Sequence, residues 1–239
     1  MKTKILAIFA CLLWGSAFAG AKIGFEYTTP LHLSGMRFML AGLLLIPFLI
    51  YQKIDWISNL KEWRYMLLFG FLQTFIQYGF FFMGLNKVPA AISAIIIGGG
   101  PFFVAVMAHF TMGNDRMSFR KILAIVLGMA GIVFISFAKG GSIHTDASFY
   151  YGVILLIISN IVGASTNIIV AKNRNKVSPV MLTAFANFSG GLILYIVSFF
   201  TEDWYVKPYS LEFYIAWIWL ALIPAVGFSI WYSLLKFLN

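Results

Sequence analysis

The sequence has 239 residues, of which 61% are hydrophobic and 10% are charged, and its formal net charge is +9. A soluble domain carries about 25% charged residues, so these charges are too few to cover a surface in water. The composition therefore excludes a soluble enzyme, a disordered chain and, with Cys11 as the single cysteine, a disulfide scaffold. Long apolar runs also exclude a β-barrel, whose strands alternate apolar and polar residues.

Eight segments of the chain are long and apolar enough to cross a membrane, which takes about 20 residues. Connectors rich in proline, glycine and asparagine separate them and leave no room for a soluble domain. The predicted fold class is therefore all-α, a polytopic transmembrane helix bundle. The expected spans are 5–24, 31–51, 64–85, 89–112, 119–138, 149–171, 179–200 and 211–236.

The lysines and arginines predict the orientation, because cytoplasmic loops are enriched in them. With a cytoplasmic N-terminus, 12 of the 17 lie on the cytoplasmic side, four lie on the outer side, and Arg37 lies within a span. The positive charge then reflects topology and does not indicate a nucleic-acid partner. The first span mimics a signal peptide, but its apolar run continues past Ala19 to Ile23, which favours a retained helix.

A weak internal repeat is visible at a shift of about 149 residues. Pro30 and Pro179 precede corresponding spans, and Ala41-Gly42 corresponds to Gly190-Gly191. Because the first copy has five spans, the second copy enters the membrane from the opposite side. Inverted repeats of this kind are typical of secondary transporters.

The repeat predicts two domains. The first repeat covers 1–138 with spans 1 to 5, and the second covers 148–239 with spans 6 to 8. Eight spans of an expected ten are then present, and about 48 further residues are expected in the natural protein. The alternative is a complete protein of eight spans.

Several motifs resemble those of EamA-domain proteins in the drug/metabolite transporter superfamily. Leu12-Leu13-Trp14-Gly15-Ser16-Ala17-Phe18 is similar to their LLWGSxF opening, and Met36-Arg37-Phe38 with Ala41 is similar to the RFxxA of their second helix. The resemblance implies ten helices in two inverted five-helix repeats, and transport of small metabolites, often export. Further similar segments are Phe82-Met83-Gly84-Leu85, Val88-Pro89-Ala90, Pro101-Phe102, Val177-Ser178-Pro179 and 231–236.

Arg37 is the first candidate for the substrate pathway, because an ionisable group inside the membrane is costly, by about 2.5–3.5 kcal/mol on insertion scales. It would bind an anionic group such as a carboxylate through paired hydrogen bonds. The alternative is a structural arginine that bonds carbonyls or reaches the interface. Carboxylates are absent from the interior of the expected spans, so a membrane-embedded proton relay is not predicted, and Glu26 near the outer interface is the nearest candidate.

Further pathway candidates are polar or aromatic side chains within the spans. Amides in lipid are unfavourable, so their helix faces should point inward, either to line a pathway or to join helices by hydrogen bonds. The aromatic residues could form walls of a cavity, or pack the bundle. These candidates are Trp14, Ser16, Gln73, Gln77, Asn160, Asn167, Asn187, Trp231 and Tyr232.

Glycines indicate close packing and one helix break. Gly20 and Gly24 on the first span, and Gly190 and Gly191 on the seventh, would let another backbone approach. The run Gly98-Gly99-Gly100-Pro101 interrupts the fourth span and predicts a broken helix or hinge, or else a kink that neighbours absorb.

The leading hypothesis is an inner-membrane carrier of small organic solutes, amino-acid-like or drug-like, in a bacterium. It would export or exchange them by alternating access between the two repeats. A channel, a membrane scaffold or an intramembrane enzyme is the alternative, although no catalytic motif supports an enzyme. The expected partners are the lipid bilayer and a small-molecule substrate, with a homodimer left open, and neither a cofactor nor a metal is predicted.

Overall fold

The computed structural model describes residues 2–111, 146–173, 175–203, 205 and 207–235, with a few positions between 118 and 130. These residues fold almost entirely into helices, and six helical stretches are long and apolar enough to span a membrane. The predicted all-α polytopic bundle is confirmed, while most of the expected span 119–138 lies outside the described residues. The six are Pro30–Tyr51, Trp63–Lys87, Ala90–Thr111, Ala147–Lys172, Pro179–Thr201 and Leu211–Trp231.

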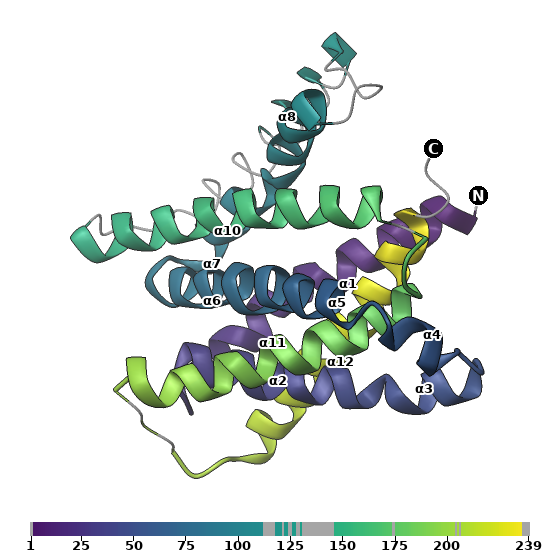
Figure 1. Cartoon of the computed structure of the whole chain (residues 1–239). Helices are drawn as coiled ribbons and strands as arrows, with labels where there is room; N and C mark the ends of the chain where they lie inside the picture. Colours follow the sequence, from purple (N-terminus) through teal and green to yellow (C-terminus); the bar gives the residue numbers. More distant parts are fainter. Residues whose placement is uncertain are drawn as a thin grey trace. The chain divides into compact units, whose positions relative to one another are not determined.

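Several expected spans consist of two or three helical pieces (Figure 1). The helix that begins at Pro30 ends at Leu44 because Pro47 lacks an N–H and its ring crowds the carbonyl four residues earlier. The third span contains a π-helix, a wide turn that is often found at functional sites. The helices are α1 (Lys2–Phe25), α2 (Pro30–Leu44), α3 (Ile46–Tyr51), α4 (Trp56–Leu60), α5 (Trp63–Gly70), η1 (Phe71–Gln77), α6 (Tyr78–Lys87), α7 (Ala90–Gly98), α8 (Gly100–Thr111), α10 (Ala147–Lys172), α11 (Pro179–Thr201) and α12 (Leu211–Leu235).

The chain divides into two compact units by its internal contacts. Unit 1 consists of residues 1–79 and 170–239, and unit 2 consists of residues 80–169. In unit 1, α11 packs along α2 and against α5 and η1, and α12 packs along α1. This division follows packing and differs from the division at the repeat boundary, which stays a prediction.

The α2–α11 contact in unit 1 depends on glycines, because their missing side chains let the backbones approach. A Cβ on Gly42 would lie 2.8 Å from the carbonyl oxygen of Ala184, and one on Gly191 would lie 3.1 Å from that of Gly35. The expected shift of 149 residues relates Gly42 to Gly191 and Gly35 to Ala184. Applying the expected shift to one contact therefore gives the pair of residues that form the other contact, as in a twofold self-complementary interface.

Unit 2 is built around α10. A Cβ on Gly84 of α6 would lie 2.8 Å from the carbonyl oxygen of Gly152 on α10, so these two helices also meet at glycines. Farther along α10, the Ser165 hydroxyl lies 3.7 Å from the Met107 sulfur of α8. The first contact joins α6 to α10, and the second places α8 beside α10.

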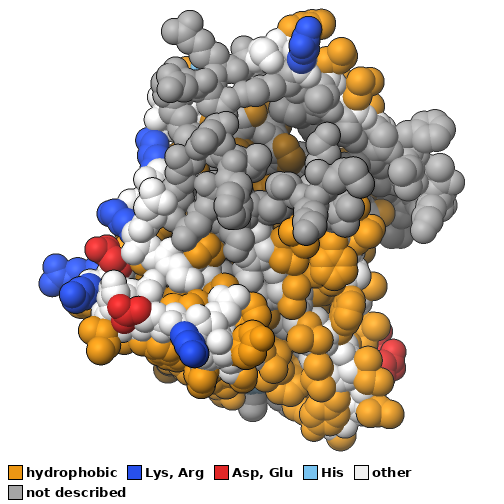
Figure 2. All heavy atoms as spheres, turned by 90° about the vertical axis from the view of Figure 1, so that its right-hand side faces the viewer, with side chains coloured by type: hydrophobic (Ala, Val, Ile, Leu, Met, Phe, Trp, Pro, Cys, Tyr) orange, Lys and Arg blue, Asp and Glu red, His pale blue; other side chains and the backbone are white. Residues whose placement is uncertain are grey.

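The surface of the described residues is strongly apolar. Exposed side chains such as Ile50, Ile57, Phe110 and Phe200 have more than 60% of their area accessible, which suits contact with lipid. Figure 2 shows hydrophobic side chains over broad areas of one face, and most of the charged side chains visible there gather in one region. Both features match a bundle that spans a membrane.

Candidate functional site

Arg37 lies on α2 inside unit 1 and is only 2% exposed. Its guanidinium carbon lies 4.3 Å from the ring centre of Phe38 and 5.4 Å from that of Tyr78. Both distances allow cation–π attraction, which helps to hold a positive charge away from water. The buried arginine that the sequence predicts is therefore placed among aromatic rings.

These rings continue across unit 1 as an aromatic cluster that joins four helices. Tyr78 lies 4.7 Å from Phe38 and 6.0 Å from Phe228, while Trp14 lies 5.5 Å from Phe228 and 5.7 Å from Trp231 between ring centres. These separations are typical of favourable edge-to-face or tilted packing. The structure thus connects Arg37 with the predicted Trp14 and Trp231 through Tyr78 and Phe228, which sequence patterns alone did not single out.

A polar face in the same unit lies between α11 and η1. Asn187 is buried, and on its helix it is followed by Gly190, which packs against Thr74 of η1, and by Gly191, which packs against Phe38 of α2. Residues three and four apart share a helix face, so Asn187 lies on the face that meets both neighbours. Gln73 on η1 is buried as well, whereas Gln77 is half-buried.

Asn160 and Asn167 lie in unit 2. The side-chain amide of Asn160 donates to the carbonyl oxygen of Ile96 on α7, close to where that helix ends at Gly98. The amide of Asn167 donates 2.8 Å to the carbonyl oxygen of Gly163 on its own helix. Asn160 therefore joins two helices at the break.

The predicted interruption of the fourth span coincides with the junction of α7 and α8. Helix α7 ends at Gly98, and the N–H of Gly99 bonds the carbonyls of Ile95 and Ile96 before α8 begins at Gly100. A Cβ on Gly100 would lie 3.2 Å from Oδ1 of Asn160, so little space is left there. The role of this segment as a hinge stays a prediction.

Replacing Asn160 by alanine should loosen this junction, because the Ile96 carbonyl loses its side-chain donor. Interhelical hydrogen bonds in membranes contribute about 0.6 kcal/mol on average, so a small drop in the thermal unfolding midpoint of the purified protein is expected. Thr201→Ala is the control, since the Thr201 hydroxyl bonds the carbonyl oxygen of Val197 within its own helix α11. Equal midpoints for the two variants would contradict a joining role of Asn160.

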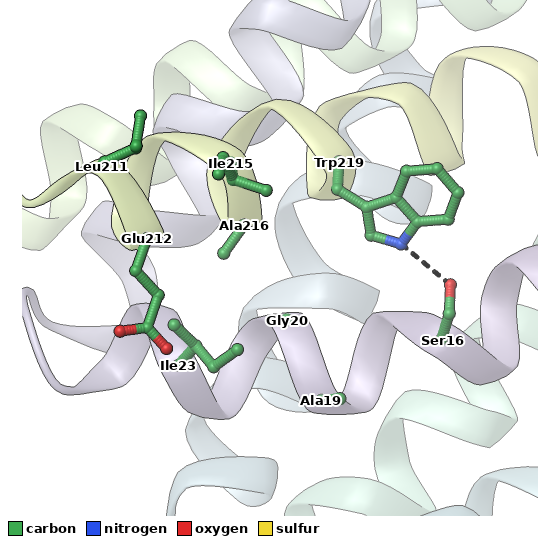
Figure 3. A pocket seen from close by; sticks show the side chains of 9 residues that line it. All are labelled: Ser16, Ala19, Gly20, Ile23, Leu211, Glu212, Ile215, Ala216 and Trp219. Atoms are coloured by element: carbon green, nitrogen blue, oxygen red, sulfur yellow. Dashed lines mark hydrogen bonds between the residues drawn. The ribbon is translucent and has the colours of Figure 1, made fainter.

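A pocket of about 580 Å³ lies between α1 and α12 in unit 1 (Figure 3). At one end the indole N–H of Trp219 donates 3.0 Å to the hydroxyl of Ser16, and toward the other end lies the Glu212 side chain. Ser16 also donates to the carbonyl oxygen of Leu13. Ser16 is a predicted pathway residue that lines this pocket, whereas Arg37 does not line it. The other residues that line the pocket are Ala19, Gly20, Ile23, Leu211, Ile215 and Ala216.

The predicted packing glycines lie at helix contacts. A Cβ on Gly20 would lie 3.2 Å from the Leu220 side chain of α12, and one on Gly24 would meet Leu33 of α2. Gly190 and Gly191 lie on α11 against η1 and α2. The side chain of Tyr232, which was also predicted to line the pathway, lies outside the described residues.

The sequence patterns missed a carboxylate at one end of unit 1. Glu202 follows α11 and accepts hydrogen bonds from the backbone N–H groups of Leu31 and His32, at 2.9 and 3.3 Å. Burial raises the pKa of the Glu202 carboxyl, although these two hydrogen bonds and one from Thr29 oppose the shift. Glu202 and Leu31 are 171 residues apart, so no local sequence pattern predicts their contact. Pro30 does predict the start of a helix, whose first N–H groups need a cap.

Comparison with known proteins gives a family match and a related fold. Residues 1–137 match the sequence model described as the EamA-like transporter family. A solved crystal structure covers 98% of the chain with a TM-score of 0.82 at 18% identity, and the chain covers 79% of it. At that identity the likeness shows the fold alone.

Curated relatives are named as transporters. The chain is 25% identical over 234 residues to the uncharacterized transporter YvbV of Bacillus subtilis, covering 98% of the chain and 75% of YvbV. It is 26% identical to the uncharacterized inner membrane transporter YedA of Escherichia coli, covering 92% of the chain and 70% of YedA. A probable amino-acid metabolite efflux pump of Escherichia coli is 29% identical over 133 residues, which is 55% of the chain and 42% of the pump.

Proposed function

Since the chain belongs to the EamA-like transporter family, we propose that it is a secondary carrier that exports or exchanges small amino-acid-like metabolites. The observation that supports this substrate class is the buried Arg37 beside Phe38 and Tyr78. A guanidinium offers a planar fork of donors that matches a carboxylate. The neighbouring rings would contact an apolar side chain of the solute.

The pathway in this proposal runs along the interior of unit 1, past Arg37 and the aromatic cluster. Asn187 and Gln73 would offer hydrogen bonds to a polar solute, because both are buried within the same unit. The name of the Escherichia coli efflux pump supports an amino-acid-like solute and the direction of export.

The carrier would work by alternating access, with one repeat rocking against the other. The reciprocal α2–α11 contacts support a twofold arrangement of the two repeats, which is the arrangement on which this mechanism depends. We place the protein in the bacterial inner membrane with a cytoplasmic N-terminus. The support is the lysine and arginine distribution and the inner-membrane relative YedA.

Exchange measured in vesicles tests the proposal. Purified protein is reconstituted, and uptake of a panel of labelled amino acids is followed with and without unlabelled solute inside. A carrier should give saturable uptake that internal solute accelerates, because the loaded carrier returns faster than the empty one. Saturation without acceleration would favour a channel, and the absence of uptake for every solute would favour a scaffold.

A further inference from the structure

The pocket between α1 and α12 is a groove on the surface of unit 1, and its α12 side is open. Leu211, Ile215 and Trp219, which line it from α12, are 76%, 62% and 43% exposed. Between the two helices the groove is lined by small residues that are buried, Gly20 of α1 and Ala216 of α12. In a membrane, lipid tails would therefore have direct access to this groove.

At one end of the groove the polar groups already have partners in the protein. The indole N–H of Trp219 donates 3.0 Å to the Ser16 hydroxyl, and that hydroxyl donates 2.7 Å to the carbonyl oxygen of Leu13 (Figure 3). Polar groups that face lipid need such partners, because hydrocarbon offers none. A ligand at this end therefore needs no polar group, and a hydrocarbon chain suits it.

The other end of the groove carries a carboxylate. Figure 3 shows the Glu212 side chain extending from α12 toward Ile23 of α1. Glu212 is exposed, and none of the described residues makes a hydrogen bond or an ion pair with its carboxylate. Because Glu212 lies in the first turn of α12, this end of the groove belongs near the membrane surface, at the level of lipid headgroups.

The length of the groove fits within one half of a bilayer. Glu212 and Trp219 are seven positions apart on α12, which corresponds to about 10 Å along a helix. The hydrocarbon core is about 30 Å thick, so each leaflet contributes about 15 Å of it. A lipid whose headgroup lies at Glu212 would therefore have the first part of one tail inside the groove. With the expected orientation of the chain, this lipid belongs to the outer leaflet.

We propose that the groove between α1 and α12 binds a phospholipid with a primary-amine headgroup, whose ammonium pairs with Glu212 and one of whose tails lies along Gly20 and Ala216. A primary ammonium donates charge-assisted hydrogen bonds to a carboxylate. A quaternary ammonium pairs by charge alone, and an anionic headgroup is repelled. Lys22 and Glu26, the charged residues at the nearby end of α1, do not line the groove. Recognition of the headgroup therefore depends on Glu212.

The lipid site is separate from the proposed solute pathway, because Arg37 does not line the groove. Ser16, a predicted pathway residue, lies instead on the lipid side, where it accepts from Trp219. A ligand that binds only the folded protein stabilises it by mass action, so the lipid should raise the thermal unfolding midpoint. The site can therefore be tested without any transported solute.

Native mass spectrometry of the detergent-solubilised protein measures the binding directly. The probes are dioleoyl phosphatidylethanolamine, phosphatidylcholine and phosphatidylglycerol, which share their acyl chains and differ in the headgroup. The ethanolamine lipid should bind about 3-fold to 10-fold more tightly than the glycerol lipid, with the choline lipid between them, because ion pairs at exposed carboxylates are modest. Glu212→Gln should remove this preference. Glu26→Gln, which removes an exposed carboxylate outside the groove, should keep it.

Ala19→Phe tests the place of the lipid tail. It adds a ring to an exposed wall of the groove, so it should weaken the binding of all three lipids and abolish the rise in the thermal midpoint. Leu12→Phe is its control, because Leu12 is 69% exposed on α1 and does not line the groove. The midpoint of each variant without added lipid shows that it is folded.

Equal binding of the three lipids to the unaltered protein would overturn the proposal, as would a preference that survives in Glu212→Gln or disappears in Glu26→Gln. Undiminished binding to Ala19→Phe would show that the tail lies elsewhere. The same spectra report the oligomeric state. A dimer that Ala19→Phe abolishes and Leu12→Phe preserves would show that a second copy of the chain, and not a lipid, fills the groove.

Discussion

Arg37→Ala should raise the solute concentration for half-maximal transport by roughly 10-fold to 100-fold. Hydrogen bonds to a charged group contribute about 1.5–3 kcal/mol, and each 1.4 kcal/mol corresponds to a factor of ten. The loss should be large because Arg37 is 2% exposed, so water does not readily replace it as a partner for a carboxylate. Initial rates of vesicle exchange over a range of solute concentrations give this value.

Arg37→Lys is the matched variant, because it keeps the positive charge and loses the planar fork. We expect partial recovery of affinity with lysine and none with alanine. Amounts of each variant in the membrane are compared, so that binding is separated from stability. Unchanged affinity in Arg37→Ala would remove Arg37 from the substrate site, and loss of the protein from the membrane would indicate a structural arginine.

Most of the architecture could be predicted because its signals are local. Apolar runs of about 20 residues predict spans wherever they occur, and the described ones are helical. The glycine run at 98–100 predicts the break between α7 and α8 because glycine ends helices readily. The π-helix in the third span had no comparable signal, since Phe71–Gln77 carries neither glycine nor proline.

Only some residues of the candidate site could be predicted from the sequence. Arg37 stood out because a charge inside a span is rare, and Trp14 and Trp231 because they belong to family-like motifs. Phe228 carries no such mark among 25 phenylalanines, and its place between Trp14 and Tyr78 depends on how α12 packs on α1. Contacts between distant segments are set by tertiary packing, which a single sequence does not reveal.

The contact of the charged residue Glu202 with the start of α2 could not be predicted from the sequence either. In the sequence it lies in a polar connector, where a carboxylate is ordinarily solvated, and Glu26 is the nearest candidate for a proton-binding group. The structure brings Glu202 to the start of α2, where two N–H groups lack partners within their own helix. The need for a cap could be predicted from Pro30, but the residue that supplies it could not.

Gly191→Ala should lower the stability of the bundle markedly, because it places a side chain in the contact between α2 and α11. The added Cβ would lie 2.7 Å from the backbone nitrogen of Met39 and 2.9 Å from Cβ of Phe38, so α2 and α11 would have to move apart. Overpacking of this kind costs about 1–3 kcal/mol, which corresponds to a drop of about 2–12 °C in the thermal midpoint. Thermal aggregation of the detergent-solubilised protein, followed by size-exclusion chromatography, measures the drop.

Gly15→Ala is the control, because a Cβ there would meet nothing within 4 Å. Alanine favours a helix over glycine by about 0.8–1 kcal/mol, so its midpoint should stay the same or rise. Gly42→Ala should lower the midpoint about as much as Gly191→Ala, since its Cβ would lie 2.7 Å from Cβ of Phe188 and 2.8 Å from the Ala184 carbonyl oxygen. The double variant should lose less than the sum, because one separation of α2 from α11 relieves both overlaps. If Gly191→Ala proved as stable as Gly15→Ala, close backbone packing would not be what holds α2 against α11.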